Sequence, residues 1–504
     1  MTASMLRYAP LALACAAAMS PVAAAEVEAG LRAEAGQAGS VDTLIVLGAK
    51  APKSLLRTDG DYLERRRNLV DTLRATAEVS QADLRKWLDA QGVAYRSYWI
   101  VNSIQATVTA DQLDQLGARS DIAAIRANRY LPLQLPADSS SGEAPAAGSQ
   151  SNAPLATEWG VDKVRAPEVW AMGIRGQNVV VAGQDTGYRW DHPALKAKYR
   201  GWNGATTNHS YNWHDAIHVA GSSCGADSSA PCDDHGHGTH TMGTMVGDDG
   251  AGNQVGVAPD ARWVGCRNMN SGDGTPATYI ECTQWFIAPT DTAGQNPDSD
   301  MAPDIVNNSW GCPTSEGCTT GQEISEAIGN IVDAGIFFVA AAGNSGSACS
   351  TITDPPAIYD ATFTVGGTNS ADNMYAGSGR GPVAGSVNGK PDVIAPGQTV
   401  RSSVPNYSNT ANGYYSSFTG TSMASPHVAG VAALLMSMNS SLKGDPQAVA
   451  DLLRSTAVPL TSTTQVCGGI PATTFPNPVQ GYGQVDAFAA FMVAEKIFAD
   501  GADD

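Results

Sequence analysis

Three separate segments of the chain carry side chains that could cooperate in nucleophilic catalysis. Ser422 lies in FTGTSMASPHVAG, where small neighbours would let a substrate backbone come close. His237 lies in the glycine-rich segment DDHGHGTHTMG, and Asp185 ends the apolar run VVVAGQD. A serine hydroxyl is a poor nucleophile unless a base takes its proton and a third group orients that base. An aspartate, a histidine and a serine are the groups that this chemistry needs.

Each of these residues also has a purely structural interpretation. Ser422 could be the N-cap of the helix that follows it, because serine is common there. Pro426 is tolerated in a first helical turn, which predicts that this helix begins close to Ser422. Asp185 could cap the turn at Thr186, and His237 could be a loop histidine bonded to a backbone carbonyl. Taken together, however, the three segments favour catalysis.

A zinc site is the rival interpretation of the histidine-rich segment, which holds His235, His237 and His240. Such a site needs an open coordination position and a supporting carboxylate. It would also leave Ser422 and Asp185 without a purpose. The cysteines do not have the C-x-x-C spacing of a zinc site either. We therefore expect no metal in the chemistry.

The elements that must position these residues are short apolar strands. The runs NVVVAGQDTG, ARWVGCRNM, PDIVNNSWG, GIFFVAAAGN and ATFTVGGT are continuous rather than alternating, and helical stretches lie between several of them. Strands buried on both faces predict an α/β fold with a mainly parallel sheet and helices on each side. Ligands bind beyond the carboxyl ends of such strands. Asp185, Trp310 and Asn344 should therefore share one rim.

The chain divides into four parts. Residues 1–25 resemble a secretory signal, with Arg7, an apolar run and a small-residue cleavage site. Residues 26–136 form a small α+β unit, and 137–154 is a linker rich in Ser, Ala, Gly and Pro. Residues 155–504 form the main domain.

The spacing of apolar residues within the first unit predicts the order strand, helix, strand, helix, strand. Residues 42–49 and 103–110 are strand-like, and 62–91 has apolar positions at helical spacing. A short helix over 110–118 and an extended segment over 129–135 complete a small open sandwich.

Cysteine usage supports export. A lipoprotein anchor at Cys15 is disfavoured because Ala12 stands where leucine is usual. Removal of the signal leaves eight cysteines, which suggests up to four disulfides in an oxidising compartment. Cys224–Cys232 and Cys312–Cys318 are the favoured local pairs, because each closes a loop rich in Gly, Ser and Pro. We expect a secreted, extracellular protein, with the periplasm as the alternative.

The charge distribution excludes some partners. The formal net charge is −19, and residues 26–135 contribute nothing to it because their 14 basic and 14 acidic side chains cancel. The acidic excess therefore lies in the main domain, which argues against nucleic-acid and anionic-membrane partners.

Five motifs occur in order along the main domain: QDTG, HGHGTHTMGT, NNSWG, AAAGNSG and GTSMASPHVAG. With them, residues 155–490 resemble the subtilisin-like serine peptidases (subtilases). NNSWGCP and DPPAIYDATFTVG are closer to the bacillopeptidase F-like branch of that family. The resemblance implies a subtilisin-like fold, polypeptide substrates, and an inhibitory propeptide in 26–136 that also assists folding.

The same resemblance implies a role for each site residue. Asp185 would orient the imidazole, His237 would act as base and then as acid, and Ser422 would attack the scissile carbonyl. Asn344 would donate its amide to the oxyanion, with the Ser422 backbone N–H as second donor.

Two segments would bind the peptide as an added strand. The first segment contains Ser309, Trp310 and Gly311, and the second contains Ala342 and Gly343. Trp310 stands where a smaller leucine is common in the family, which would narrow or cap the pocket.

Some positions depart from the family or have no role in it. Ala194 replaces an acidic residue that binds structural calcium in many members, so calcium is doubtful there. Asp248 and Asp249 remain either solvated turn residues, which we favour, or a calcium site. His240 and His427 are interpreted as buried structural histidines.

The sequence thus predicts a monomeric, secreted serine endopeptidase made as a self-processing precursor, with no cofactor required for the chemistry. A non-catalytic protein that keeps the fold is disfavoured by the complete set Asp185, His237, Asn344 and Ser422. An esterase is disfavoured because no G-x-S-x-G surrounds Ser422 and the order Asp, His, Ser is not that of α/β-hydrolases.

Overall fold

The computed structural model describes most of the chain. The described residues are 25–57, 59–132, 157–313, 318, 322–386, 389–406 and 414–500. The linker over 137–154 and all but the last residue of the signal over 1–25 lie outside these residues, so both remain predictions. Within the described residues no helix is long and apolar enough to cross a membrane.

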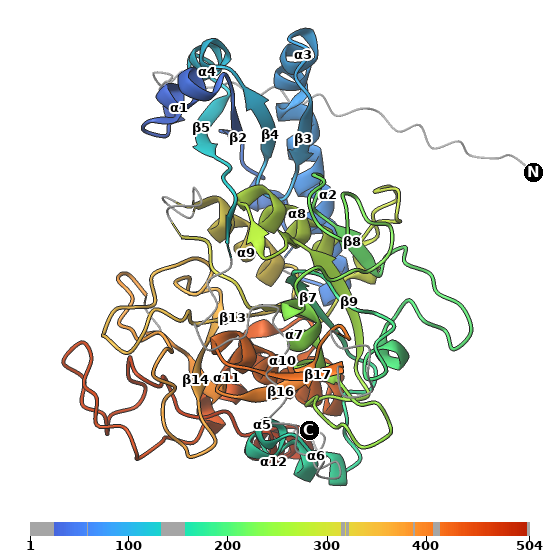
Figure 1. Ribbon diagram of the computed structural model, residues 1–504, viewed down its shortest axis with the longest axis vertical. Coiled ribbons are helices and arrows are strands. Elements are labelled where there is room, and N and C mark those ends of the chain that lie inside the picture. Colours follow the sequence, from blue (N-terminus) through green and yellow to red (C-terminus); the bar gives the residue numbers. More distant parts are fainter. Residues whose placement is uncertain are drawn as a thin grey trace, which may run out of the picture.

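A seven-stranded parallel sheet organises the main domain, which confirms the predicted α/β architecture (Figure 1). All six pairs of neighbouring strands are parallel. In spatial order the strands are β15 (Val393–Pro396), β14 (Phe363–Thr368), β13 (Phe337–Ala341), β12 (Ile305–Asn308), β7 (Val180–Asp185), β9 (Arg262–Arg267) and β8 (Trp213–Asp215). The five central strands are the five apolar runs read from the sequence.

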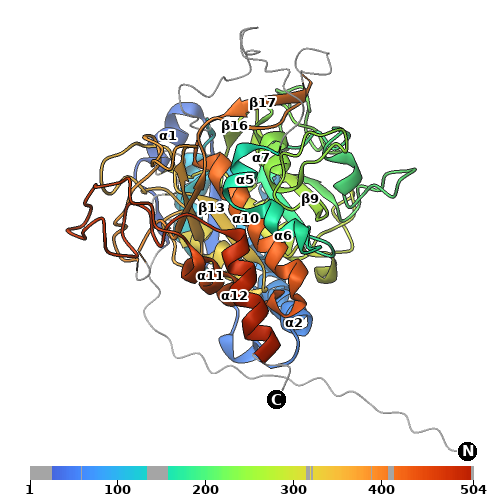
Figure 2. The ribbon, with the colours of Figure 1, turned by 90° about the horizontal axis from the view of Figure 1, so that it is seen from below.

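Helices cover both faces of this sheet. One face carries α5 (Trp159–Lys163), α6 (Ala166–Ala171), α7 (His237–Val246), α10 (Thr421–Met438), α11 (Pro446–Thr456) and α12 (Ala487–Asp500). Viewed from this side, α10 lies in the middle, with α7 on one side and α11 and α12 on the other (Figure 2). The opposite face carries α8 (Pro276–Ile287) and α9 (Gln322–Asp333).

Successive side chains of the strands enter different cores, because strand residues alternate between the two faces of a sheet. In β7, Val181 packs with the α10 side and Ala182 with the α8 side. In β12, Ile305 and Val306 divide in the same way. This double burial explains why the strands are continuous apolar runs.

The N-terminal unit is a five-stranded mixed sheet with four helices. Its strands, in spatial order, are β1 (Glu26–Val27), β5 (Ile122–Ala127), β2 (Val41–Leu47), β4 (Ser103–Val108) and β3 (Tyr95–Tyr98). Its helices are α1 (Leu31–Ala38), α2 (Tyr62–Ser80), α3 (Ala82–Ala90) and α4 (Ala110–Gly117).

The predicted strands over 42–49 and 103–110 and helices over 62–91 and 110–118 are confirmed in the main. The extended segment over 129–135 contains β6, and its residues 133–135 lie outside the described residues. The predicted order was incomplete. The stretch over 62–91 forms two helices separated by Gln81 alone. β1, α1, β3 and β5 were not predicted. β5 reads IAAIRA, whose alanines carry no strand preference, and β1 has only two residues.

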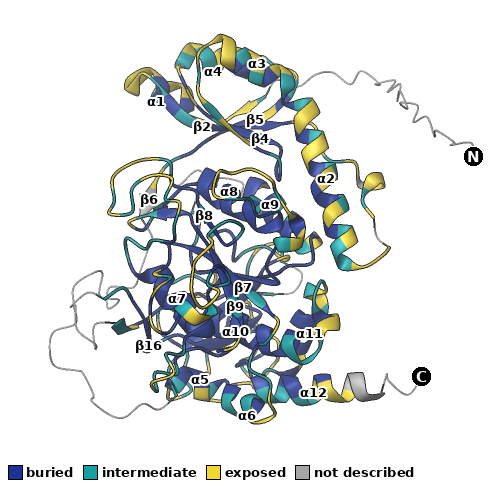
Figure 3. Ribbon diagram, turned by 90° about the vertical axis from the view of Figure 1, so that its right-hand side faces the viewer, coloured by how far each residue is buried: buried dark blue, intermediate teal, exposed yellow. Residues whose placement is uncertain are grey.

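The N-terminal sheet rests on α8 and α9 of the main domain (Figure 3). Ile45 and Leu47 of β2 face the unit's own helices, whereas Leu44 and Val46 belong to the core that contains α8 and α9. The second face of this small sheet is therefore buried by the neighbouring domain.

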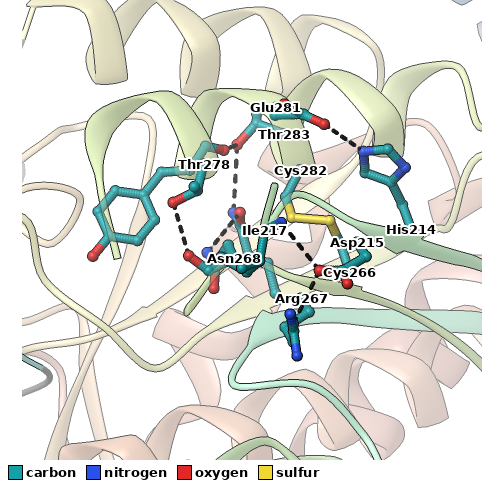
Figure 4. The surroundings of a disulfide bond; sticks show 12 residues. His214, Asp215, Ile217, Cys266, Arg267, Asn268, Thr278, Glu281, Cys282 and Thr283 are labelled. Carbon is teal, nitrogen blue, oxygen red and sulfur yellow. Dashed lines mark hydrogen bonds and ion pairs between the residues drawn. A yellow bond between two sulfur atoms is a disulfide. The ribbon is translucent and has the colours of Figure 1, made fainter. Parts of the chain in front are cut away.

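Four disulfides brace the main domain. Cys224–Cys232 and Cys312–Cys318 are the two predicted local pairs. The other two are Cys266–Cys282 and Cys349–Cys467. Cys266–Cys282 ties β9 of the sheet to α8 (Figure 4).

Smaller elements complete the fold. Two antiparallel ladders join β16 (Val400–Ser403) to β17 (Tyr415–Phe418), and β10 (Met269–Asn270) to β11 (Asp273–Gly274) and β6 (Leu131–Pro132). Short 3₁₀ turns are Lys53–Leu55, Lys196–Lys198, Ser299–Met301 and Ser440–Leu442.

Candidate active site

The carboxyl ends of β7, β12 and β13 lie at one edge of the central sheet. Asn308 of β12 is in register with Gln184 on one side and Ala340 on the other. Asp185 ends β7, and Trp310 and Asn344 follow the ends of β12 and β13. The structure thus brings these three residues to the predicted rim.

Asp185 and His237 form a buried pair at this rim. His237 Nδ1 donates a hydrogen bond to Asp185 Oδ1 over 2.7 Å, and both residues are 1% exposed or less. The Thr186 N–H donates to the same oxygen over 2.7 Å. A proton on Nδ1 leaves Nε2 of the neutral imidazole as an acceptor. Nε2 is buried and has no hydrogen-bond partner among the described residues.

Glycine lets α7 approach the strand end closely enough for this pair. α7 begins at His237, after Gly236 with a φ of 97°. A Cβ on Gly238 would lie 3.0 Å from Asp185 Cβ and would collide with the Gly187 carbonyl. Only glycine fits such a contact without displacing the strand.

Ser422 is the second residue of α10 and is 3% exposed. Its hydroxyl donates to the Ser309 carbonyl over 3.1 Å. Among the described residues no hydrogen bond joins it to His237. Catalytic hydrogen bonds often tighten only when substrate binds. Both residues nevertheless lie at the same rim, because Ser309 follows β12 and Asp185, which holds His237, ends the neighbouring strand β7.

The position of Pro426 differs from the prediction. It is the sixth residue of α10 rather than part of a first turn. Proline has no N–H, so the carbonyl four residues earlier, that of Ser422, has no helical donor. The Ser309 hydroxyl donates to this carbonyl instead, over 2.9 Å. A tertiary contact therefore satisfies the group that local rules leave unpaired.

Asn344 is held with its amide in one orientation. Its Oδ1 accepts from the Thr421 N–H over 2.9 Å and from the Thr421 hydroxyl over 3.1 Å. A backbone N–H can only donate, so Oδ1 must face α10 and the side-chain NH₂ must point elsewhere. Asn344 is partly exposed. The amide is thus a donor directed away from the helix.

The predicted peptide-binding residues flank this rim on two segments. Ser309 and Ala342 are buried, whereas Gly311 and Gly343 are partly exposed. The Trp310 ring is 3% exposed and stacks on Tyr279, with 3.9 Å between ring centroids. Whether Trp310 narrows a pocket remains a prediction.

The remaining histidines of these segments are structural or lie beside the pair. His240 Nε2 donates to the Val400 carbonyl over 3.0 Å, and burial lowers its pKa to about 3. His427 Nδ1 donates to the Met423 carbonyl within α10, and burial lowers its pKa to about 4. Both therefore stay neutral. The ring of His235 is 6.5 Å from that of His237.

The donor sets do not suit a metal ion. Among the described residues no group of three or more His, Cys, Asp or Glu side chains could hold one. Ala194 offers no ligand, and the Asp249 carboxylate already accepts from Asn253 and Tyr415. The doubt about calcium at Ala194 and at Asp248 and Asp249 stays a prediction.

Two features of the site region were missed by the sequence analysis. The first is the Ser309 hydroxyl, for which the missing N–H of Pro426 was an available signal. The second lies between the domains, where Glu281 of α8 accepts from His214 over 2.8 Å (Figure 4). Tyr98 of β3 donates to the same carboxylate over 3.1 Å. No sequence motif marks this cluster.

An added strand lies next to the rim. The Asn268 N–H, just after β9, donates to the Asp185 carbonyl over 3.0 Å. The chain continues into β10 and β11, and β6 pairs antiparallel with β11, Leu131 opposite Gly274. β6 comes from the end of the N-terminal unit. This unit therefore adds a strand to the β10–β11 ladder, which follows β9 next to Asp185.

Comparison with known proteins gives a family match and several relatives. Residues 176–483 match the model of the subtilase family. The chain is 37% identical to bacillopeptidase F of Bacillus subtilis (strain 168) over 88% of its own length and 30% of that protein. It is 35% identical to subtilisin DY of Bacillus licheniformis over 60% of its length and 92% of that protein. It is 32% identical to the major intracellular serine protease of Bacillus subtilis (strain 168), over 55% and 74% of the two lengths.

Proposed function

Because the chain belongs to the subtilase family of serine peptidases, we propose that it is a secreted endopeptidase that cleaves proteins through an acyl-enzyme. The observation that carries this proposal is the buried Asp185–His237 pair, set at the edge where α10 presents Ser422. The match to subtilisin DY, which spans most of that protein, supports it.

In the proposed reaction His237 Nε2 takes the proton of the Ser422 hydroxyl as the oxygen attacks the scissile carbonyl. The Nδ1–H···Asp185 bond keeps Nε2 unprotonated before the attack and stabilises the imidazolium afterwards. The imidazolium then gives its proton to the leaving amine, and an acyl group remains on Ser422. A water molecule, deprotonated by the same nitrogen, releases the acid.

Two donors would stabilise the oxyanion. The Asn344 amide is one, since its Oδ1 is engaged by Thr421. The Ser422 N–H is the other, because the first N–H groups of a helix have no partner within it. The partial positive charge at the start of α10 acts in the same direction.

The test of this proposal is Ser422→Ala. We expect the variant to keep the thermal unfolding midpoint (Tm) of the wild type, to lose casein hydrolysis, and to lose labelling by a fluorophosphonate probe. Ser403→Ala, at a buried serine bonded to the Thr239 carbonyl, serves as the matched control. Casein hydrolysis at the wild-type rate by Ser422→Ala would refute the assignment of the nucleophile.

We also propose that residues 26–136 act as an inhibitory propeptide. Support comes from β6, because an extended segment that adds to β11 uses the edge that a peptide substrate would use. The sheet of this unit rests on α8 and α9, which would hold β6 in place. Secretion is proposed from residues 1–25 and from the four disulfides.

Maturation provides a separate test. The secreted wild type should lose the N-terminal unit by cleavage within about 131–154, whereas Ser422→Ala should remain uncleaved when secreted alone. N-terminal sequencing of both secreted proteins measures this. Equal processing of the two would show that another protease matures the chain.

A further inference from the structure

The hydroxyl of Ser309 occupies a place in the site that the proposed mechanism does not use. Ser309 follows β12 and is 1% exposed. Its hydroxyl has three partners: it lies 2.9 Å from the Ser422 carbonyl, 3.0 Å from Ser425 Oγ and 3.0 Å from Asn307 Nδ2. These groups are all buried.

Counting protons fixes the direction of each bond. A serine hydroxyl has one hydrogen and two lone pairs. The Ser422 carbonyl can only accept, so the hydrogen of Ser309 is given to it. Asn307 Nδ2 can only donate. Ser425 must donate too, because Ser309 has already given its one hydrogen to the Ser422 carbonyl. Both donors thus hold the Ser309 hydroxyl in the orientation that serves Ser422.

The Ser422 carbonyl needs this donor because of Pro426. In an uninterrupted helix the N–H of residue 426 would bond to the carbonyl of residue 422, and proline removes that N–H. A buried carbonyl without a partner is costly. Ser309 replaces the helical bond with one that comes from the end of the central sheet.

We propose that Ser309 is a positioning residue for Ser422, whose hydroxyl substitutes for the amide hydrogen missing at Pro426 and fixes the Ser422 peptide unit at the rim. The proposal rests on the proposed role of Ser422 as nucleophile. A second bond reinforces it, since the Ser422 hydroxyl donates back to the Ser309 carbonyl over 3.1 Å. The nucleophile is then anchored to the strand edge as well as to its helix.

The test is a double-mutant cycle with Ser309→Ala and Pro426→Ala. Ser309→Ala leaves the Ser422 carbonyl without a donor, and Pro426→Ala supplies an N–H in the helical position. A displacement of about 1 Å at a reacting group costs about 10²-fold, so we expect Ser309→Ala to lower kcat by roughly 10- to 100-fold. KM for a short peptide p-nitroanilide should stay within about twofold, because alanine keeps the backbone carbonyl at position 309.

The double variant is the decisive measurement. It should regain at least about fivefold in kcat over Ser309→Ala, because the new N–H replaces the lost hydroxyl. The rate of inactivation by a fluorophosphonate should follow the same pattern, and Tm is recorded for every variant. Ser403→Ala is again the control, because the Thr239 carbonyl it serves keeps a helical donor in Gly243.

Three results would overturn the proposal. They are a Ser309→Ala variant as active as Ser403→Ala, a double variant whose kcat is the product of the two single effects, and a double variant that folds no better than an unfolded Ser309→Ala. Failure of the proposed function would give a different result: Ser422→Ala would still hydrolyse peptides. That measurement does not involve any Ser309 variant.

Discussion

Two contacts in this protein bury polar groups in contrasting ways. Where the N-terminal unit meets α8 and α9, many of the buried partners are charged. Arg126 is paired with Glu323 over 3.4 Å, and Glu281 accepts from Tyr98. Arg67 and Asp300 form a further pair at 2.6 Å, which is exposed to solvent. A cleft of about 610 Å³, lined by residues of both domains, lies within this contact.

Where α7 meets α10 and β16, the buried groups are neutral. His240 and His427 are uncharged because burial lowers the pKa of each to about 4 or below. The hydroxyls of Ser402 and Ser403 donate to carbonyls of α7. Glycine allows the close approach, since a Cβ on Gly243 of α7 would collide with Ser402 and Ser403 of β16.

The two contacts should differ in the free energy that it costs to separate their surfaces. Charged side chains are well solvated in water, so the halves of an ion pair lose little when they part. Neutral groups in a tight apolar contact would expose both apolar area and unpaired polar atoms. Both contacts bury apolar side chains, among them Leu44 and Val46 in the first. The contrast lies in the polar groups: those of the first contact are compatible with a unit that leaves, as the propeptide proposal requires, and those of the second with permanent support for the site.

The largest expected effect is at the catalytic pair beside the permanent contact, where Asp185 of β7 holds His237, the first residue of α7. Asp185→Asn should lower kcat by about 10⁴-fold, the size of the same change in an unrelated Ser-His-Asp peptidase, because an amide favours the wrong imidazole tautomer. Steady-state kinetics on a peptide p-nitroanilide would measure it. Asp191→Asn, at an exposed aspartate paired with Arg189, is the control. A loss below tenfold would contradict the assignment.

Asn344→Ala should have the next largest effect, a fall in kcat of about 10²–10³-fold, which is the range measured on subtilisin itself. KM should change little, because the donor acts on the oxyanion rather than on the bound substrate. Because Asn344→Ala also removes the acceptor of the buried Thr421 N–H, the Tm of the Asn344→Ala, Ser422→Ala precursor should lie only a few degrees below that of Ser422→Ala. A large loss of Tm would make Asn344 a structural residue.

A smaller effect is expected at the separable contact. In the Ser422→Ala precursor, Tyr98→Phe removes a donor to the buried Glu281 carboxylate and should destabilise by about 1.5–3 kcal/mol. Chemical denaturation of the precursor would measure it. In the active background the mature enzyme should keep its kcat, because Tyr98 belongs to the unit that is removed. A changed kcat would show that the contact of the N-terminal unit with α8 and α9 also affects the active site.

The smallest effect is a pH dependence of the same contact. Burial alone would lower the pKa of His218, but bonds and charge attraction from Glu281 and Asp227 outweigh burial and Arg96, and raise this pKa above 6.5. A raised pKa means that the folded state holds the proton more tightly than the unfolded one. The stabilisation is complete below pH 6.5 and is lost as pH rises through the raised pKa. The Tm of the Ser422→Ala precursor should therefore fall over this range, and His218→Gln should flatten the fall.

Much of the fold could be predicted, because strands that are buried on both faces appear in the sequence as continuous apolar runs. Each central strand is a continuous apolar run, and each run ends in a polar residue at the rim. The elements that were missed lack such patterns. β8 has three residues, and β5 contains three alanines, which do not favour a strand. Gln81, between α2 and α3, keeps helical dihedrals and donates from its side chain to the Tyr98 carbonyl, a contact that no local rule supplies.

The family, the parallel sheet and the residue types at its edge could all be predicted from the amino-acid sequence, because motifs and burial patterns are local properties of the chain. Tertiary structure decided how those residues are held: the Asp185–His237 bond, the orientation of Asn344, the donor for the Ser422 carbonyl, and the seat of the N-terminal unit on α8 and α9. Each of these depends on the distance between atoms far apart along the chain. Such distances are set by packing of the whole domain, which is a property that no single segment carries.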